Sequence, residues 1–336
     1  PATTWRPVRH PEDDMTPLLA VVGPTASGKT SLGVELGAAV GGELINIDSM
    51  QVFRGLDVGT DKPTPAQRSR VPFHLVDVLE PGELFDAATC ARLGGAAAEA
   101  IWARGRIPIA AGGTGLYHRA LRHGLIDAPP RDDAFRAGLR ARREAEGIEA
   151  LYAELDRLDP DAAAAIKPTD WVRIERALEV QHLTGATISS AHAQHGFGPE
   201  RFRCWTIGCF RPREELYAGI ESRLEQMWTS GLLDETRALL DRGFSLDVLP
   251  LKALGYRHAA LFLRGELGRD EALALAKRDT KRFAKRQLTW FRADRSVCWL
   301  RVPLEQAALQ RLAAAVRDFT AGAEPRTLEL PTVDAV

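Results

Sequence analysis

The stretch GPTASGKT at residues 23–30 restricts the possible folds of this chain more than any other feature. It matches the pattern G-x-x-x-x-G-K-[ST], follows the apolar run 18–22, and opens a segment of helical pattern. In such a strand–loop–helix unit, backbone N–H groups turn toward phosphate oxygens, Lys29 adds a positive charge, and the Thr30 hydroxyl can bind Mg²⁺. We therefore predict a phosphate-binding loop whose contacts come from Gly23, Pro24, Thr25, Ala26, Ser27, Gly28, Lys29 and Thr30. The motif alone leaves open whether the ligand is ATP.

Apolar runs rich in Val and Ile alternate with helical patterns along most of the chain. The runs are residues 18–22, 44–47, 74–79, 107–111, 205–210 and 297–302. This alternation predicts an α/β fold with a P-loop NTPase-like parallel sheet core covered by helices. Long helices are expected after the fifth run, at residues 213–242, 255–263 and 270–294.

The alternation stops at residues 131–202, which are rich in Ala, Arg, Glu and Leu and contain no convincing strand. We interpret this stretch as an inserted helical domain, with one helix at residues 169–183. The core is then discontinuous, formed by residues 17–130 and 203–316. Residues 1–16 are expected to be a disordered leader, and residues 317–336 a tail.

The composition is that of an ordinary globular protein, with 336 residues of which 45% are hydrophobic and 26% charged. The four cysteines form no C-x-x-C pair, which argues against a zinc ribbon or a disulfide framework. No apolar run reaches the length of a membrane span, and the first residues lack a signal-peptide core. We therefore expect a cytoplasmic protein with no membrane partner, and we expect it to be a monomer.

The net charge of −1 conceals a strongly basic tract near the C-terminus. Between residues 250 and 301 the chain has thirteen Lys or Arg and five Asp or Glu residues. Such a tract can bind the phosphate backbone of a nucleic acid, and it can equally be the solvated face of a helix. Charge alone does not decide between the two.

Polar side chains follow two of the predicted strands. Asp48 and Gln51 come after the run 44–47, and Thr114 lies in AGGTGLY after the run 107–111. Because the carboxyl ends of parallel strands line the ligand crevice of an open sheet, both segments are expected near the phosphate loop. Each also has a structural explanation, since Asp can cap a turn and glycines can form one. Arg223, on a predicted helix, could reach the phosphates or pair with a surface Glu.

Taken together, these segments resemble the tRNA dimethylallyltransferase family (tRNA isopentenyltransferases) in its bacterial form. The resemblance runs from about residue 18 to residue 295 and is carried by GPTASGKT, IDSMQVFRGLDVGTDKP, FHLVDVLEP, AGGTGLYHRAL, RIERALEV, GLLDETRALL, ALGYRHA and KRQLTWFR. It implies transfer of a dimethylallyl group from dimethylallyl diphosphate to a tRNA. The acceptor is N6 of the adenosine at position 37, beside the anticodon, and diphosphate is released.

The resemblance also implies roles for single residues. Asp48 is the general base or orienting acceptor, Thr114 flanks the reaction channel, and Arg223 binds the diphosphate together with the loop and Mg²⁺ at Thr30. Contacts with the anticodon stem-loop are implied for Asp48, Ser49, Met50, Gln51, Thr114, Arg136, Val172, Arg173, Ile174, Glu175, Arg176, Lys252, Ala253, Leu254, Gly255, Tyr256 and Arg257.

Other classes of protein use the same loop. A small-molecule or nucleoside kinase would bind ATP there, with Asp48 deprotonating a hydroxyl and Asp77 serving the magnesium, but it has no clear use for the basic tract. A GTPase needs an Asn-Lys-x-Asp loop, and Asn46 is the only Asn in the chain. A purely RNA-binding module would not explain the phosphate loop.

Overall fold

The computed structural model describes residues 15–125, 129–195 and 199–325. The leader predicted at residues 1–16 lies mostly outside these ranges, as does most of the tail predicted at residues 317–336. Within the described residues, the Thr16 carbonyl accepts a hydrogen bond from the Arg203 N–H at 3.1 Å, so the chain is already paired with the sheet there. The first residues of the predicted tail, 317–320, belong to a helix that ends at Thr320.

The chain forms two compact units. One contains the residues up to Arg122 together with those from Glu200 onward, and the other contains His123–Pro199. The predicted insert, residues 131–202, begins eight residues after the start of the smaller unit and ends three residues after its end. No helix in the described ranges is both long enough and apolar enough to cross a bilayer.

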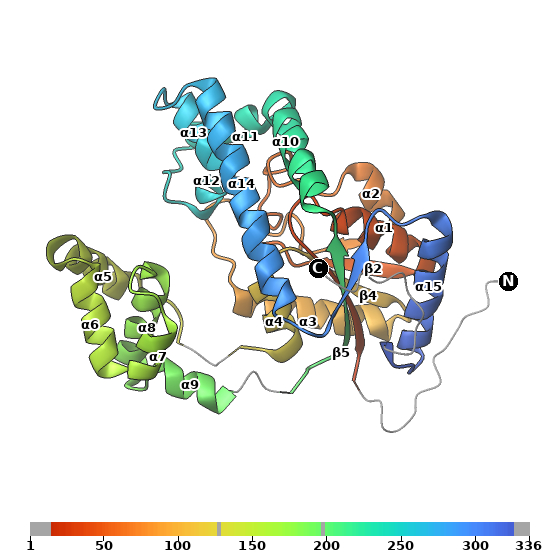
Figure 1. Ribbon diagram of the computed structural model, residues 1–336, viewed down its shortest axis with the longest axis horizontal. Coiled ribbons are helices and arrows are strands. Elements are labelled where there is room, and N and C mark those ends of the chain that lie inside the picture. Colours follow the sequence, from red (N-terminus) through yellow and green to blue (C-terminus); the bar gives the residue numbers. More distant parts are fainter. Residues whose placement is uncertain (1–14, 126–128, 196–198, 326–336) are drawn as a thin grey trace. The chain divides into compact units, whose positions relative to one another are not determined.

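The larger unit is built on a sheet whose neighbouring strands are all parallel (Figure 1). Its strand order is β3-β2-β4-β1-β5-β6. The strands are β1 (Pro17–Val22), β2 (Gly42–Asn46), β3 (Phe73–His74), β4 (Ile107–Gly112), β5 (Arg203–Phe210) and β6 (Val297–Arg301). The central strand β1 is buried along its whole length, as expected for a parallel strand covered on both faces. The predicted α/β fold is confirmed.

Helices cover both faces of this sheet. The helices of the larger unit are α1 (Lys29–Val40), α2 (Pro65–Arg70), α3 (Ala87–Ala103), α4 (Gly115–His123), α10 (Arg213–Ser230), α11 (Leu232–Asp241), α12 (Leu249–Lys252), α13 (Tyr256–Leu263), α14 (Arg269–Arg292) and α15 (Gln306–Thr320). Because alternate residues of a strand face opposite ways, Leu19 and Val21 join a core with α1 and α15. On the other face, Gly94 of α3 lies against Ile45 of β2.

Two predicted elements differ in the structure. The run 74–79 was expected to be a strand, but β3 ends at His74, because Leu75 and Asp77 have left-handed backbones with φ of 60° and 57°. The helix expected at residues 213–242 is broken at Gly231, whose φ is 131°. The glycine separates α10 from α11, so that two helices replace one.

The smaller unit contains helices and, in its described part, no strand. Its helices are α5 (Asp133–Glu146), α6 (Ile148–Leu158), α7 (Pro160–Ala165), α8 (Trp171–Thr184) and α9 (Ile188–His195). They enclose a separate apolar core to which Leu139, Leu151 and Ile174 contribute. The residues of this core come from helices of the smaller unit and not from the sheet. The helical pattern of the sequence was therefore sufficient to predict this unit.

Candidate active site

The strand order brings three loops together at one edge of the sheet. β1, β4 and β2 are neighbours, and they lead into the phosphate loop, the Gly113–Thr114 turn and the Asp48 turn respectively. The carboxyl ends of parallel strands share an edge, so residues far apart in the sequence meet there. The sequence-based expectation that Asp48 and Thr114 lie near the phosphate loop agrees with this arrangement.

The phosphate loop requires glycine at its two ends. Gly23 has a φ of 149°, and a Cβ there would lie 2.9 Å from both the Cys209 carbonyl oxygen and Ser27 Oγ. Gly28 has a φ of 88° at the start of α1, in the left-handed region that L side chains rarely adopt. The Ser27 N–H donates within the loop to the Pro24 carbonyl at 3.2 Å. The first N–H groups of α1, at the positive end of the helix dipole, are therefore the backbone donors suited to bind an anion.

Lys29 supplies the positive charge of the loop. Among the described residues its ammonium donates one hydrogen bond, a long one of 3.4 Å to the Pro24 carbonyl. Burial lowers the pKa of Lys29, and the neighbouring Asp48 carboxylate partly opposes this shift. A half-buried cation with one weak partner is well suited to hold an anion.

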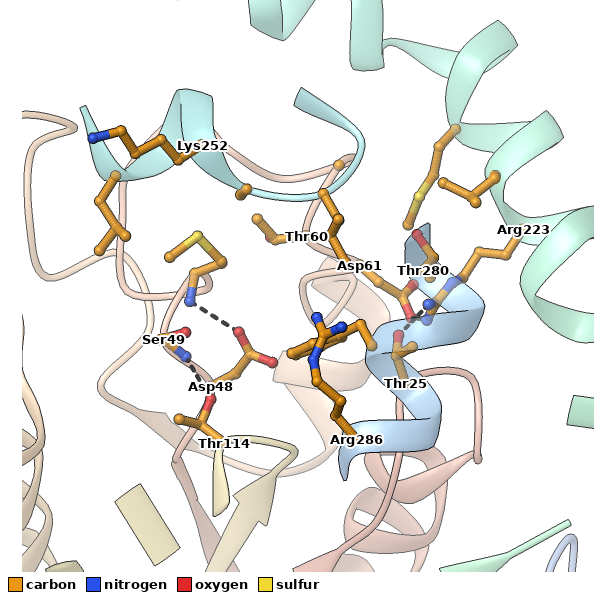
Figure 2. A pocket seen from close by; sticks show the side chains of 18 residues that line it. Thr25, Asp48, Ser49, Thr60, Asp61, Thr114, Arg223, Lys252, Thr280 and Arg286 are labelled. Atoms are coloured by element: carbon orange, nitrogen blue, oxygen red, sulfur yellow. Dashed lines mark hydrogen bonds and ion pairs between the residues drawn. The ribbon is translucent and has the colours of Figure 1, made fainter. Parts of the chain in front are cut away.

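Asp48 is held in place by its own turn. Asn46 accepts a hydrogen bond from the Asp48 N–H at 3.0 Å and donates to the Asp48 carbonyl at 3.2 Å. The Asp48 Oδ1 accepts from the Met50 N–H at 2.9 Å. Within the described chain Oδ2 accepts no hydrogen bond, and the carboxylate lines the cavity described next (Figure 2). One oxygen thus fixes the side chain while the other is left for a ligand.

The loops enclose a cavity of about 370 Å³. Thr114 reaches it beside Asp48, and its Oγ1 accepts a hydrogen bond from the Ser49 N–H at 3.2 Å (Figure 2). The cavity is lined by Thr25, Asp48, Ser49, Met50, Gly59, Thr60, Asp61, Thr114, Arg223, Leu224, Met227, Leu249, Lys252, Ala253, Leu254, Thr280, Phe283 and Arg286. Its polar and apolar walls suit a ligand that has a charged head and a hydrocarbon part.

Arg223 extends from α10 into the same cavity. It donates to Asp61 Oδ2 at 2.9 Å and to Thr25 Oγ1 (Figure 2). Its Nε is buried and has no hydrogen-bond partner among the described residues. The guanidinium therefore lies against the phosphate loop with two of its five N–H donors engaged by the described residues, the position expected of an anion-binding group.

The oxygen donors around the loop fit a Mg²⁺ ion shared with a substrate phosphate. Thr30 lies in the first turn of α1. The carboxylate of Asp48 lies close enough to Lys29 to oppose the lowering of the Lys29 pKa by burial. The buried Ser27 Oγ has no hydrogen-bond partner among the described residues. The described residues contain no cluster of three or more His, Cys, Asp or Glu side chains able to hold a metal. Mg²⁺ commonly binds through one or two protein oxygens, water and phosphates rather than in a cage of side chains.

Comparisons with known proteins show the family of the chain. A family model described as IPP transferase matches residues 51–294, and one described as Isopentenyl transferase matches residues 16–71. The tRNA dimethylallyltransferase 1 of Pelobacter propionicus is 46% identical over 294 residues, covering 88% of this chain and 95% of the relative. The tRNA dimethylallyltransferase of Anaeromyxobacter dehalogenans is 48% identical over 296 residues, covering 88% and 98%. The chain belongs to the IPP transferase family.

Solved structures lead to the same family. The tRNA isopentenylpyrophosphate transferase of Bacillus halodurans superimposes with a TM-score of 0.68 at 37% identity, over 91% of this chain and 97% of that one. A eukaryotic dimethylallyltransferase acting on tRNA has the same fold, with a TM-score of 0.79 at 24% identity. The resemblance found in the sequence motifs is confirmed, and the chain is a transferase.

The predicted tRNA contacts at residues 252–257 differ in exposure. Lys252 and Arg257 are exposed, and Lys252 also lines the cavity. Tyr256 is fully buried, and its hydroxyl donates to Glu235 at 2.6 Å, while Gly255 is buried as well. The side chain of Tyr256 therefore packs inside the larger unit, and a contact of Tyr256 with tRNA would have to be made by its backbone.

The residues of the smaller unit for which tRNA contacts are predicted also differ in burial. Ile174 lies in the apolar core, and Glu175 is buried between Arg136 and Arg140, each 3.3 Å away. Arg136 donates two hydrogen bonds of 2.7 Å to the fully buried Glu179. Burial opposes ionisation of that carboxyl, but hydrogen bonds from Arg136, Arg176 and a backbone N–H lower the pKa of Glu179 to about 2.

These ion pairs give Arg136 a structural task inside the smaller unit. Arg176 is likewise engaged with Glu179 and with the Pro129 carbonyl. Val172 and Arg173 are exposed, with 70% of Val172 accessible. Of the predicted stretch 172–176, the side chains of Val172 and Arg173 are the ones best placed to meet RNA.

The loop at residues 57–61 is a part of the site that the motifs did not assign. The Glu235 carboxylate of α11 accepts hydrogen bonds from the N–H groups of Asp57, Val58 and Gly59, at 2.9, 2.7 and 3.1 Å. Gly59 has no room for a side chain, since a Cβ there would lie 2.4 Å from the Tyr256 ring. Glu235 thus fixes the loop that brings Asp61 to Arg223.

Replacing Glu235 by alanine is expected to destabilise the larger unit by about 2–3 kcal/mol, because three backbone donors and a tyrosine hydroxyl lose a charged acceptor. Urea unfolding measures the change. Asp234→Ala, next to it on α11 and 82% exposed, is the matched control and should change stability by less than about 0.5 kcal/mol. Equal changes in the two variants would show that the loop does not depend on Glu235.

Proposed function

We propose that this chain transfers the dimethylallyl group of dimethylallyl diphosphate to N6 of the adenosine at tRNA position 37, next to the anticodon. The observation that carries the proposal is that Thr25 of the phosphate loop, Arg223 and the Asp48 carboxylate all line one cavity (Figure 2). A leaving-group site and a proton acceptor are thus brought together, and the curated relatives named above are tRNA dimethylallyltransferases.

The leaving diphosphate is stabilised by groups already in place. As the allylic carbon–oxygen bond breaks, negative charge grows on the diphosphate oxygens. The loop N–H groups, Lys29 and Arg223 meet this charge in a partly buried cavity, where such interactions are strong. When Mg²⁺ is bound, it adds positive charge to the same oxygens. The N–H groups need no reorganisation, because the conformation of the loop is set by its glycines.

The nucleophile is the exocyclic N6 of adenine, whose lone pair is delocalised into the ring. Asp48 Oδ2 is the oxygen available to accept an N6 proton as the C–N bond forms. The Thr114 hydroxyl, beside Asp48, orients the incoming amine. The adenine must first leave the stack of the anticodon loop, and contacts with the RNA backbone offset that cost of a few kcal/mol.

One assay tests the proposal. Purified protein is incubated with Mg²⁺, an unmodified anticodon stem-loop RNA, and labelled dimethylallyl diphosphate, with labelled ATP in a parallel reaction. We expect the prenyl label to move to the adenosine at position 37, and no label to move from ATP. Consumption of ATP with a small acceptor, without prenyl transfer, would overturn the proposal in favour of a kinase.

The structure weakens the kinase alternative at Asp77. This carboxylate accepts hydrogen bonds from the Lys62 ammonium and from Arg68, the latter at 2.7 Å. Burial raises the pKa of Asp77, but these two cations outweigh it and lower the pKa overall. Asp77 is therefore committed to a local ion-pair network and lines a different cavity from Asp48.

The basic tract forms a groove between α10 and α14. We define the basic groove as Arg213, Tyr217, Glu221, Ala274, Lys277, Arg278, Lys281, Arg282 and Lys285, which enclose about 490 Å³. The Tyr217 ring lies 5.1 Å from the Arg213 guanidinium and 5.5 Å from the Lys281 ammonium. An aromatic ring among cations on an exposed groove suits the backbone and bases of an RNA strand.

Replacing Arg282 and Lys285 by alanine is expected to reduce the slope of log affinity for RNA against log salt by about 2, one for each cation. Both side chains are exposed, although Arg282 also lies 3.5 Å from Asp279 on its own helix, whereas Lys281 is half-buried and paired with Glu221. The measurement is a salt titration of stem-loop binding. Alanine replacement of Arg237 and Arg311, exposed outside the groove, is the control. An unchanged slope in the groove variant would mean that the groove does not contact RNA.

A further inference from the structure

A glutamine of α14 joins two loops of the site. The Gln287 side-chain Oε1 accepts a hydrogen bond from the Thr25 N–H at 2.8 Å, and its Nε2 donates to the Gly113 carbonyl at 2.8 Å. Gln287 is 7% exposed, so both bonds are shielded from water. Thr25 belongs to the phosphate loop and Gly113 precedes Thr114. One amide therefore connects the leaving-group side of the cavity with the acceptor side.

The surroundings of Gln287 are shaped to accept this amide. A Cβ on Gly113 would lie 2.3 Å from Gln287 Nε2, so only glycine permits the contact. One turn further along α14, Trp290 packs against Gly115, where a Cβ would lie 2.2 Å from the indole ring. The helix is thus seated against the end of β4 at two successive turns, and its position relative to Gly113 is fixed.

Both partners of Gln287 are directly connected to residues with proposed roles in the reaction, Thr25 through a hydrogen bond and Gly113 through the peptide chain. The hydroxyl of Thr25 accepts a hydrogen bond from Arg223, and the hydroxyl of Thr114, next to Gly113, accepts from the Ser49 N–H. A shift of either loop would change the distance between the diphosphate and the adenine amine. A displacement of about 1 Å can reduce the rate of a positioned reaction about 100-fold.

We propose that Gln287 is a positioning residue that sets the register between the diphosphate loop and the Asp48–Thr114 side of the cavity. This inference rests on the proposed function. The task requires one donor and one acceptor at the end of a single side chain, which a glutamine amide provides. A glutamate in the ionised form keeps the acceptor for Thr25 but directs a second acceptor at the Gly113 carbonyl.

The requirement for a donor leads to a test that depends on pH. In a Gln287→Glu variant the carboxylate opposes the Gly113 carbonyl when ionised, whereas the protonated carboxyl can donate to it and restore both bonds. Burial favours the protonated form of the introduced group. The ratio of variant to wild-type kcat should therefore rise as the pH falls. The other charged groups around the site are the same in both proteins, so their own titration cancels in the ratio. They are Lys29 of the loop, Asp48 after β2, Arg223 of α10 and Arg286 of α14.

The experiment compares kcat and KM for prenyl transfer to the stem-loop RNA between about pH 5.5 and 9, the range spanning a raised carboxyl pKa. At high pH we expect kcat of Gln287→Glu to fall about tenfold to hundredfold, with KM for RNA changed only a few-fold, and to recover toward wild type at low pH. Gln287→Met lacks both bonds and should show the same loss at every pH. Thr289→Ala, an exposed position of α14 that bonds only to its own helix, is the control.

The possible outcomes separate a positioning role from a scaffold role. A ratio that stays flat with pH, or a Gln287→Met kcat within about twofold of wild type, would overturn the inference. So would a loss of kcat that follows the thermal unfolding midpoint of each variant rather than the protonation of the introduced carboxyl. Absence of prenyl transfer by the wild-type protein would instead overturn the proposed function itself.

Discussion

Replacing Asp48 by asparagine is expected to lower kcat for prenyl transfer by about 10²–10⁴, the usual contribution of a general base. Asparagine preserves the shape of the side chain, and its amide oxygen can still accept the Met50 N–H that now bonds to Oδ1. The second position, which faces the cavity, becomes an NH₂ group that cannot accept a proton. The loss should therefore appear in kcat, with little change in KM for the RNA.

Single-turnover measurement with the bound stem-loop is the direct test of this expectation. Asp61→Asn is the matched comparison, because it removes the same charge from the same cavity without removing the oxygen beside Thr114. Its effect on kcat should be at least about tenfold smaller than that of Asp48→Asn. If the two variants lose rate equally, the cavity needs negative charge in general, and Asp48 is not the proton acceptor. A rate within a few-fold of wild type in Asp48→Asn would contradict the assignment directly.

Replacing Arg223 by alanine is expected to reduce kcat/KM for dimethylallyl diphosphate by about 10²–10³, the cost of losing one preorganised donor to a developing anion. The guanidinium now lies between Asp61 and the Thr25 hydroxyl, and its Nε is left without a partner in the described chain. Lysine at this position keeps the charge but not the fixed array of donors. Arg223→Lys should therefore recover only part of the loss.

Initial rates at varied donor concentration, with saturating RNA, measure the effect. Arg213→Ala, on the same helix but in the basic groove, is the control for the loss of one positive charge from α10. It should weaken RNA binding and leave the KM for the prenyl donor unchanged. Equal donor kinetics in Arg223→Ala and wild type would show that the loop and Lys29 hold the diphosphate without help from α10.

The sequence by itself was sufficient for the fold class and for the loops at the strand ends. The phosphate loop, the Asp48 turn and the Thr114 turn each follow an apolar run, and the geometry of a parallel sheet brings the ends of such runs together. Two predicted elements differ in the structure, and in each the backbone conformation of one or two residues is the reason. The left-handed residues Leu75 and Asp77 ended a predicted strand, and Gly231 divided a predicted helix.

Side-chain roles in the predicted contact stretches depended on burial, which the motifs do not encode. Lys252 and Tyr256 lie in the same predicted stretch, yet one faces solvent and the other is fully buried against Glu235. Glu175 belongs to a charged motif but is enclosed by Arg136 and Arg140. A helix has a buried and an exposed face, and residues adjacent in sequence fall on different faces.

The local sequence determined which chemistry this chain carries, namely a phosphate loop, a carboxylate at a strand end and a basic helix. Each of these depends on residues within one short segment, whose backbone preferences act locally. The tertiary structure alone decided how they are held together, since Gln287 meets Thr25 across 262 residues and Glu235 meets Val58 across 177. Such contacts follow from how helices seat on the sheet, and no local pattern specifies that packing.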